Sequence, residues 1–184
     1  INIPQTGEIT GMDALTVSVW VYPDTYVYNA SVMSFGGIYD GPFNIAQWHS
    51  QLHFVVSETS GWGTPTEGAV MGVGSYAASY TQFPGEWMHY VGIFDGAASE
   101  IRTYQNGVLM NTTVSTFTTL YSSSTETLEI GKCGSRGPWS GNIDDVGIWN
   151  RALTSAEVTT IYNSGKPTNL SGETGLVGYW RMGD

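Results

Sequence analysis

Hydrophobic and polar residues alternate along most of this chain, in short runs that turn residues separate. Alternation with a period of two is typical of strands that bury one face. Turn signals such as Asn106-Gly107 recur at intervals of roughly 8–12 residues, which favours an antiparallel sandwich. The pattern predicts strands near residues 1–4, 15–22, 31–36, 42–48, 51–57, 68–73, 86–95, 100–105, 108–114, 126–131, 142–149 and 176–182.

A single segment has a convincing helical pattern. Thr154 and Glu157 have the spacing of a capping box, in which the threonine oxygen accepts from the glutamate N–H and the glutamate reaches back. A short apolar stripe begins at Val158, and Gly165 supplies a stop signal at the other end. The sequence therefore predicts one short helix, at about residues 155–163, near the C-terminus.

Charge and composition narrow the class of partner. The 184 residues include 16 acidic and 6 basic side chains, for a formal net charge of −10. Nucleic acids and anionic membranes require a basic face, so both are disfavoured, whereas cation binding stays open. The low share of charged residues, with abundant glycine and aromatic residues, is typical of a β-rich extracellular module. The length fits one domain with a sizeable core.

Cysteine, membrane and modification signals add little. Cys133 is the only cysteine, so no intrachain disulfide is expected, and we interpret it as a small buried residue. No run approaches the ~18 apolar residues of a membrane span, and no signal peptide is visible, so no membrane insertion is expected. We interpret the chain as a segment of a longer protein with neighbouring domains. Sequons begin at Asn29, Asn111 and Asn169, and they matter only in a eukaryotic secretory route.

Several segments together carry a family resemblance. The first two are a long tryptophan-containing strand ending in proline (residues 15–23) and a G-x-W-x-H strand (85–96). An Asn-Gly hairpin (101–109), a short L-E-I-G strand (128–131) and a closing strand with a capped helix (141–158) follow. In this order they resemble a laminin-G-like domain of the concanavalin A-like lectin and glucanase superfamily. The resemblance implies an all-β fold over residues 1–165, an antiparallel β-sandwich (jelly roll) with one short helix near the C-terminus.

The end of the chain leaves two alternatives open. Residues 166–175 look like a connector, and the apolar strand at 176–182 resembles one that usually opens a laminin-G-like unit. It either completes this domain or leads a removed neighbour. We favour completion by residues 166–184, because an isolated strand would expose Tyr179 and Trp180.

Catalytic motifs of the superfamily are missing from the sequence. Related glucanases place two carboxylates on one strand face, about 5–5.5 Å apart, with an E-x-D-x-x-E spacing. Here Asp144 and Asp145 are adjacent, so we expect their side chains on opposite strand faces. No G-x-S-x-G motif accompanies the histidines, and His89 falls at the position of the family's structural histidine. The sequence therefore predicts no enzyme.

The resemblance also implies a structural calcium ion. In this family an aspartate of the closing strand and carbonyl groups of an early turn bind the ion, and oxygen donors from scattered segments suit a hard cation. Asp144 matches the aspartate, and the turn at Gly36 matches the carbonyl position. We expect Asp144 to share a strand face with Val146 and Ile148. The competing interpretation is that Asp144 caps a turn or pairs with Arg151.

Glycan binding would use aromatic faces and planar polar groups. Seven tryptophans are many for this length. Three of them lie in the predicted core strands and are expected to pack inside, namely Trp20, Trp87 and Trp149. The candidates for ligand contact lie in or beside glycine-, serine- or proline-rich segments: Trp48, Trp62, Trp139, Arg136 and Tyr39.

Together these patterns predict a non-catalytic recognition module, glycan-binding and lectin-like, in an extracellular, cell-surface or virion adhesin. The alternative is a structural or protein–protein interaction module, in which the loop aromatic residues form an interface. A glycoside hydrolase or lyase with an unrecognised site is the third interpretation.

Overall fold

The computed structural model describes residues 2–3, 9, 11–28, 30–36, 41–48, 51–59, 66–70, 85–122, 127–133 and 137–182, with the side chains of 2–3, 48 and 66–70 excepted. It confirms the antiparallel sandwich with one short helix. The elements are β1 (Asn2–Ile3), β2 (Ala14–Pro23), β3 (Ser31–Phe35), β4 (Phe43–Trp48), β5 (Gln51–Ser57), β6 (Thr66–Val70), β7 (Met88–Asp95), β8 (Glu100–Gln105), β9 (Val108–Val114), β10 (Leu128–Ile130), β11 (Gly141–Trp149), α1 (Ser155–Tyr162) and β12 (Leu176–Trp180).

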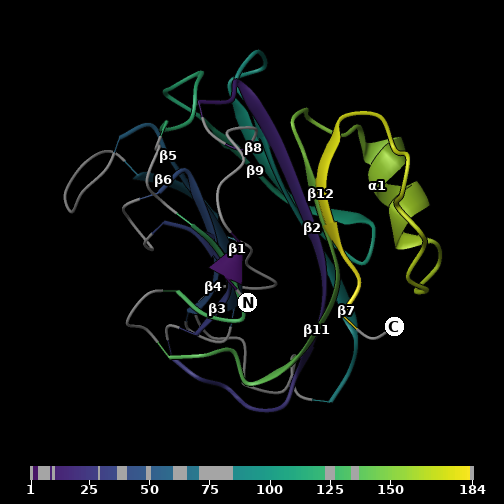
Figure 1. Cartoon of the computed structure of the whole chain (residues 1–184). Helices are drawn as coiled ribbons and strands as arrows, with labels where there is room; N and C mark the ends of the chain where they lie inside the picture. Colours follow the sequence, from purple (N-terminus) through teal and green to yellow (C-terminus); the bar gives the residue numbers. More distant parts are fainter. Residues whose placement is uncertain are drawn as a thin grey trace.

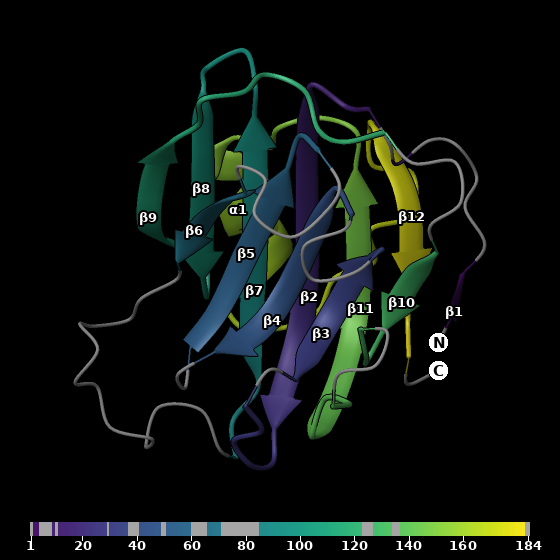
Figure 2. The ribbon, with the colours of Figure 1, turned by 90° about the vertical axis from the view of Figure 1, so that its left-hand side faces the viewer.

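The strands form two sheets that face each other (Figure 1). Sheet I has the order β1-β10-β3-β4-β5-β6, and sheet II has the order β12-β11-β2-β7-β8-β9. Helix α1 lies on the side of sheet II that faces away from sheet I, as Figure 2 also shows from a second direction. Sheet II is therefore covered on both faces over part of its area.

Strand alternation explains the main core between the sheets. In β2 the side chains of Leu15, Val17, Val19 and Val21 point inward and are fully buried. They meet buried aromatic residues of sheet I, and the sheets approach so closely that a Cβ on Gly92 would lie 2.4 Å from the Phe54 ring. Burial of such apolar area is the main force that holds the two sheets together.

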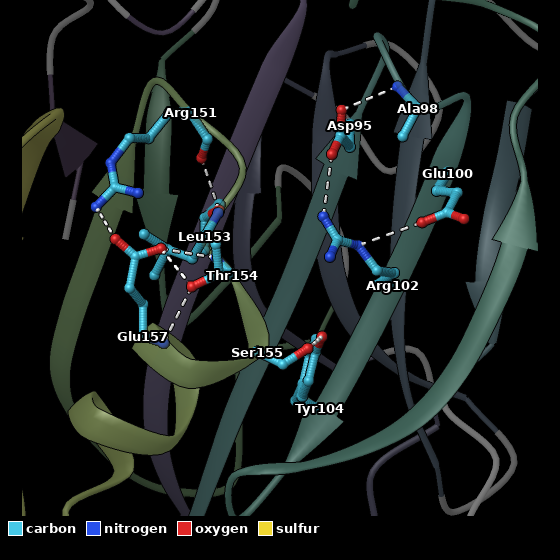
Figure 3. A network of polar contacts seen from close by, with 11 residues as sticks. Asp95, Ala98, Glu100, Arg102, Tyr104, Arg151, Leu153, Thr154, Ser155 and Glu157 are labelled. Atoms are coloured by element: carbon cyan, nitrogen blue, oxygen red, sulfur yellow. Dashed lines mark hydrogen bonds and ion pairs between the residues drawn. The ribbon is translucent and has the colours of Figure 1, made fainter.

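A second, smaller core lies between the outer face of sheet II and helix α1. Its members are buried apolar residues from β7, β8, β11, the helix and the segments that flank it: Val91, Ile93, Tyr104, Trp149, Leu153, Val158, Ile161 and Leu170. The Tyr104 hydroxyl also lies 2.8 Å from the Ser155 hydroxyl, which links β8 to the first turn of α1 (Figure 3). The helix is thus fixed to the sheet by apolar and polar contacts.

The predicted capping box is confirmed at the start of α1. The Thr154 hydroxyl accepts from the Glu157 N–H at 3.3 Å, and the Thr154 N–H donates to Glu157 Oε2 at 2.7 Å. Arg151 binds the same carboxylate at 2.8 Å (Figure 3). Hydrogen bonding from Arg151 and from the Thr154 backbone lowers the pKa of Glu157 to about 2. The helix ends at a left-handed Asn163, with φ of 47°, rather than at Gly165.

A bulge in β11 changes which residues share a face. The β2–β11 register shifts between Asp144 and Gly147, and Asp145 has a left-handed φ of 42°. An extra residue in one strand reverses the alternation beyond it. Val146 and Ile148 therefore point into the main core, whereas Asp144 lies on the outer face. The expectation that Asp144 shares their face was wrong.

The terminal strand β12 pairs antiparallel with β11. Both aspartates of the bulge hold it: Asp144 Oδ1 accepts from the Met182 N–H at 3.0 Å, and Asp145 Oδ1 accepts from the Tyr179 hydroxyl at 2.5 Å. Since Tyr179 packs against the second core, Asp145 also lies on the outer side of sheet II. The two carboxylates do not face opposite ways, contrary to expectation, because the bulge turns the chain between them.

Candidate ligand-binding groove

Two rows of side chains cross the outer face of sheet II near one end of its strands. Cross-strand register places Asp144 of β11 opposite Trp20 of β2, and Trp20 opposite His89 of β7. The next row begins with Asn142 opposite Tyr22. Directly opposite side chains in a sheet lie about 4.5–5.5 Å apart at Cβ, so each row forms one continuous surface.

The row through Trp20 is covered by the helix. Tyr162 of α1 stacks on Trp20 and on His89, with ring centroids 5.9 Å apart in both pairs. His89 Nε2 lies 2.8 Å from the Ser18 hydroxyl, and burial lowers the pKa of His89 to about 3. His89 is therefore neutral and enclosed, which fits the expected structural role rather than acid–base chemistry on a ligand.

Trp87 lies in the uncovered row. It immediately precedes β7 and packs against Tyr22, with ring centroids 5.7 Å apart. Its side chain remains 44% exposed, whereas Trp20 is 4% exposed. The expectation that Trp87 packs in the core was wrong, since no element of the described chain covers it as Tyr162 covers Trp20.

Two adjoining hollows lie beside Trp87, and both are lined by Trp87 and Asp144. We call them together the Trp87 groove. The first has a volume of about 200 Å³ and is lined by Trp20, Trp87, Asp144, Gly165 and Pro167. The second has a volume of about 360 Å³ and is lined by Trp87, Gly141, Asn142, Ile143, Asp144 and Met182.

The polar groups of the groove are available for a ligand. Asp144 makes its two hydrogen bonds through Oδ1, which accepts from the N–H groups of Asp145 and Met182. Within the described part of the chain, Oδ2 has no partner. The Asn142 side chain is exposed. The groove thus presents a carboxylate oxygen that accepts and an amide that both accepts and donates, beside an indole face.

The described residues do not assemble a calcium site around Asp144. Calcium takes six to eight oxygen ligands, usually with several carboxylates. Gly36 follows β3 in sheet I, whereas Asp144 lies on the outer face of sheet II. Among the residues that the structure describes, no group of three or more His, Cys, Asp or Glu side chains is arranged to hold a metal ion.

The bulge carboxylates do not form a catalytic pair either. Asp145 is 4% exposed, is hydrogen-bonded to Tyr179 and lies 3.7 Å from Arg181 Nε. A retaining glycosidase needs two carboxyl groups that both reach the same sugar. At the bulge, Asp144 alone faces the groove.

The sequence-predicted ligand residues are only partly visible. Trp62, Arg136 and Tyr39 lie outside the described residues, and of Trp48 only the backbone, at the end of β4, is described. They stay predictions. Trp139 is 8% exposed, belongs to the main core and donates from Nε1 to the Asn142 carbonyl oxygen at 3.3 Å.

The placement of Trp139 among exposed loop aromatic residues was therefore wrong. Its backbone N–H bonds to the Gly131 carbonyl at 2.9 Å, which holds Trp139 next to the end of β10. Sequence reasoning also missed Trp87 and Asn142 as groove residues. A signal was present: the inward run of alternate valines in β2 requires that Trp20 and Tyr22 face outward, and cross-strand pairing then brings Trp87 beside them.

Comparison with known proteins agrees with the fold. A family model described as "Concanavalin A-like lectin/glucanases superfamily" matches residues 1–159. No curated protein sequence matches the chain significantly. Across the described residues, no helix is both long and apolar enough to cross a membrane.

Many solved structures share the fold at low sequence identity. A putative carbohydrate-binding protein from Bacteroides ovatus matches with a TM-score of 0.71 and 15% identity, over 98% of this chain and 48% of that chain. Domain 4 of AbnA, an extracellular GH43 arabinanase from Geobacillus stearothermophilus in complex with arabinotriose, is a second match. Its TM-score is 0.58 at 22% identity, and the match covers 88% of this chain and 71% of that chain. A heptameric SAP-like pentraxin from Limulus polyphemus matches with a TM-score of 0.60 and 16% identity, over 88% of this chain and 80% of that chain. This chain thus spans about half of the Bacteroides protein, and these identities show the fold alone.

Proposed function

We propose that this chain, which belongs to the concanavalin A-like lectin/glucanases superfamily, is a non-catalytic module that recognises glycans. The observation that carries the proposal is the exposed Trp87 ring beside a carboxylate and an amide in an open groove. An apolar ring face packs against the C–H side of a sugar, and fixed polar groups bind its hydroxyls.

The solved relatives support the same class of ligand. One is a putative carbohydrate-binding protein, and another holds arabinotriose. Their identities to this chain are low, so the glycan itself does not transfer from them. We expect an extracellular or surface setting for this module, within a longer protein whose other domains set its target.

A glycan array with the wild-type chain tests the function. We expect the chain to bind a small, chemically related set of glycans, and we expect free sugar of the same kind to compete with the arrayed glycans for binding. A chain that binds none of the arrayed glycans, under conditions in which its melting curve shows it folded, would contradict the proposal. The predicted contact residues Trp48, Trp62, Arg136 and Tyr39 belong to the same test, because alanine at any of them should change the array pattern if they touch the ligand.

The superfamily also includes glucanases, so turnover requires its own assay. The described residues offer one carboxylate to the groove where a glycosidase uses two, and we expect no release of reducing ends from glycans that the array identifies. Sustained release that is lost on substitution of a single acidic residue would replace the binding function with a hydrolase.

A protein-interaction module is the second candidate, and one observation favours it. Strand β9 forms an edge of sheet II and exposes three apolar side chains, Val108, Leu109 and Val114. Exposed apolar edges are surfaces on which other strands dock. Self-association that rises with concentration and disappears in Val114→Lys, together with an empty glycan array, would support this candidate over the lectin.

A structural calcium ion stays a prediction. Since the described residues hold no group of three or more His, Cys, Asp or Glu side chains arranged for a metal, an ion at Asp144 Oδ2 would need other oxygen ligands, such as backbone carbonyls. If calcium bound only the native state, it would raise the melting temperature, and Asp144→Ala would abolish that rise. Equal melting temperatures in EDTA and in millimolar calcium would show that the prediction is wrong.

A further inference from the structure

The shape of the Trp87 groove restricts the size of its ligand. Its two hollows share Trp87 and Asp144 as common walls, and they extend from there in two directions, toward Pro167 on one side and toward Asn142 and Met182 on the other. Volumes of about 200 and about 360 Å³ together fall within the usual range of small-ligand sites, roughly 300–1,000 Å³. A ligand that fills both must cross the wall between them, as a chain of sugars can.

The charges of the groove restrict the class of sugar. Asp144 is the ionisable residue among the lining residues of both hollows, and no lysine or arginine lines either of them within the described chain. A sialic acid or uronate carboxylate placed here would face a like charge, on a chain whose formal net charge is −10. Two cations flank lining residues and must be included in a test: Lys166, exposed between Gly165 and Pro167, and Arg181, which directly precedes Met182.

The polar pattern fits neutral hydroxyl groups. An ionised carboxylate is an acceptor only, and sugar hydroxyls supply the donors it lacks. Oδ1 of Asp144 is held by two backbone N–H groups, so the carboxylate is fixed in orientation before any ligand arrives. A preorganised acceptor loses less conformational entropy on binding.

From these features we infer that the Trp87 groove binds a neutral oligosaccharide of at least two sugar units, which stacks on Trp87 and donates hydroxyl hydrogen bonds to Asp144 Oδ2. The inference rests on the proposed glycan-binding function and names the site and the ligand class. Neighbouring sugars would occupy the two hollows on either side of the Trp87–Asp144 wall. The groove would therefore bind an oligosaccharide rather than a single terminal sugar.

Isothermal titration with defined sugars tests this inference. The neutral probes are monomer, dimer and trimer series of β-1,4-glucose, β-1,3-glucose, α-1,5-arabinose and β-1,4-mannose, and the acidic probes are sialyllactose and trigalacturonic acid. For the series that binds, we expect affinity to rise at least ~10-fold from monomer to trimer, and the acidic probes to bind more weakly than the neutral trimer.

Variants locate the binding. Trp87→Ala should lower the affinity for the trimer at least ~10-fold, as loss of a central aromatic contact does. The melting curve of this variant should stay close to that of wild type. Asp144→Asn keeps an acceptor for the two N–H groups and should weaken binding by less. Tyr28→Ala, which removes another exposed aromatic ring, is the matched control and should bind as wild type does.

Each contrary result has a separate meaning. If the wild type binds glycans and Trp87→Ala binds them equally well, the groove is not the site and the inference fails while the glycan-binding function stands. If monomer and trimer bind equally, or if an acidic probe binds best, the inferred ligand class is wrong, and loss of that probe in Lys166→Ala or in Arg181→Ala identifies the cation that binds it. If the folded wild type binds none of these probes and no arrayed glycan, the proposed function itself fails.

Discussion

The outer face of sheet II presents two tryptophans in neighbouring rows with opposite surroundings. Trp20 lies under Tyr162 of α1 and is 4% exposed, whereas Trp87, one row further along, has no such cover from the described residues and is 44% exposed. Strands β2 and β11 carry residues of both rows. The difference shows that an outward-facing aromatic residue becomes core or binding surface according to what the rest of the chain lays over it.

Energetic consequences should differ in the same way. At the covered end, side chains from the sheet, the helix and the terminal segments bury apolar area together, so removing one leaves a cavity. At the open end, Trp87 contacts Tyr22 and otherwise faces the groove, so its loss should affect ligand binding and hardly affect folding. Each prediction below challenges this contrast between covered end and open end.

Truncation after Gly175 should have the largest effect. It removes β12 and the residues after it, which pack against both cores: Val177, Trp180 and Met182 against the main core, and Leu176 and Tyr179 against the second. It also leaves the buried Asp145 carboxylate without its Tyr179 partner. We expect loss of cooperative unfolding, seen by circular dichroism and calorimetry. A truncated chain that melts like the full one would show that residues 166–184 do not complete this domain.

Trp149→Ala should be the most damaging single substitution at the covered end. Trp149 is fully buried beside Leu153 and Val158, and truncation of a buried tryptophan typically costs ~3–5 kcal/mol. For a chain of this size that lowers the melting temperature by roughly 6–20 °C. Trp87→Ala, measured in parallel, should melt within ~3 °C of wild type. Equal losses for the two variants would abolish the contrast.

Tyr179→Phe should have a moderate effect. It removes the donor to the buried Asp145 carboxylate, which costs about 1–3 kcal/mol because the acceptor stays buried. Burial, with Asp145 beside it, raises the pKa of Tyr179 from 10.0 to about 12. The folded-state pKa is the higher one, so this contribution is complete below pH 10 and declines as the pH rises toward 12. Urea melts of both proteins across that interval should converge, and a constant difference would contradict the assignment.

Glu157→Gln should have the smallest effect on stability, about 0.5–1 kcal/mol, because its partly exposed ion pair with Arg151 is screened by solvent. The pKa of Glu157 is lowered from 4.5 to about 2 in the folded chain. Its stabilising contribution is therefore present above pH 4.5 and is lost as the pH falls toward 2. Thermal melts at pH 7 and pH 2 should show a gap between wild type and variant that closes at the lower pH, and a gap that persists would contradict this account.

Local patterns proved to be the most informative part of the sequence. The capping box at Thr154 depends on residues three positions apart, and the structure confirms it. The strands followed from alternation and turn residues for the same reason. The helix, expected at about residues 155–163, spans Ser155–Tyr162 and ends at the left-handed Asn163. Where pairing or packing between distant segments decides, the predictions were weaker.

The candidate site shows the same limit. The face of Asp144 was assigned wrongly because a bulge, which no short-range pattern announced, reverses the alternation of β11 after it. Trp139 lies outside the strands in the sequence, yet its N–H bonds to the Gly131 carbonyl and its ring is buried in the main core. Trp87 lies beside a strand in the sequence, yet it remains open because Tyr162 reaches only the neighbouring row. Exposure of each aromatic residue was decided by contacts outside its own strand or turn.

The most direct test of the central claim follows the seven indole N–H signals of the ¹⁵N-labelled chain by NMR. The Trp87 signal is assigned from its disappearance in Trp87→Phe. During titration with the neutral trimer that binds most tightly in calorimetry, we predict that the Trp87 signal shifts most, while that of the fully buried Trp149 stays in place. A titration in which another indole moves and Trp87 does not would show that the open end of sheet II is not where this module binds its glycan.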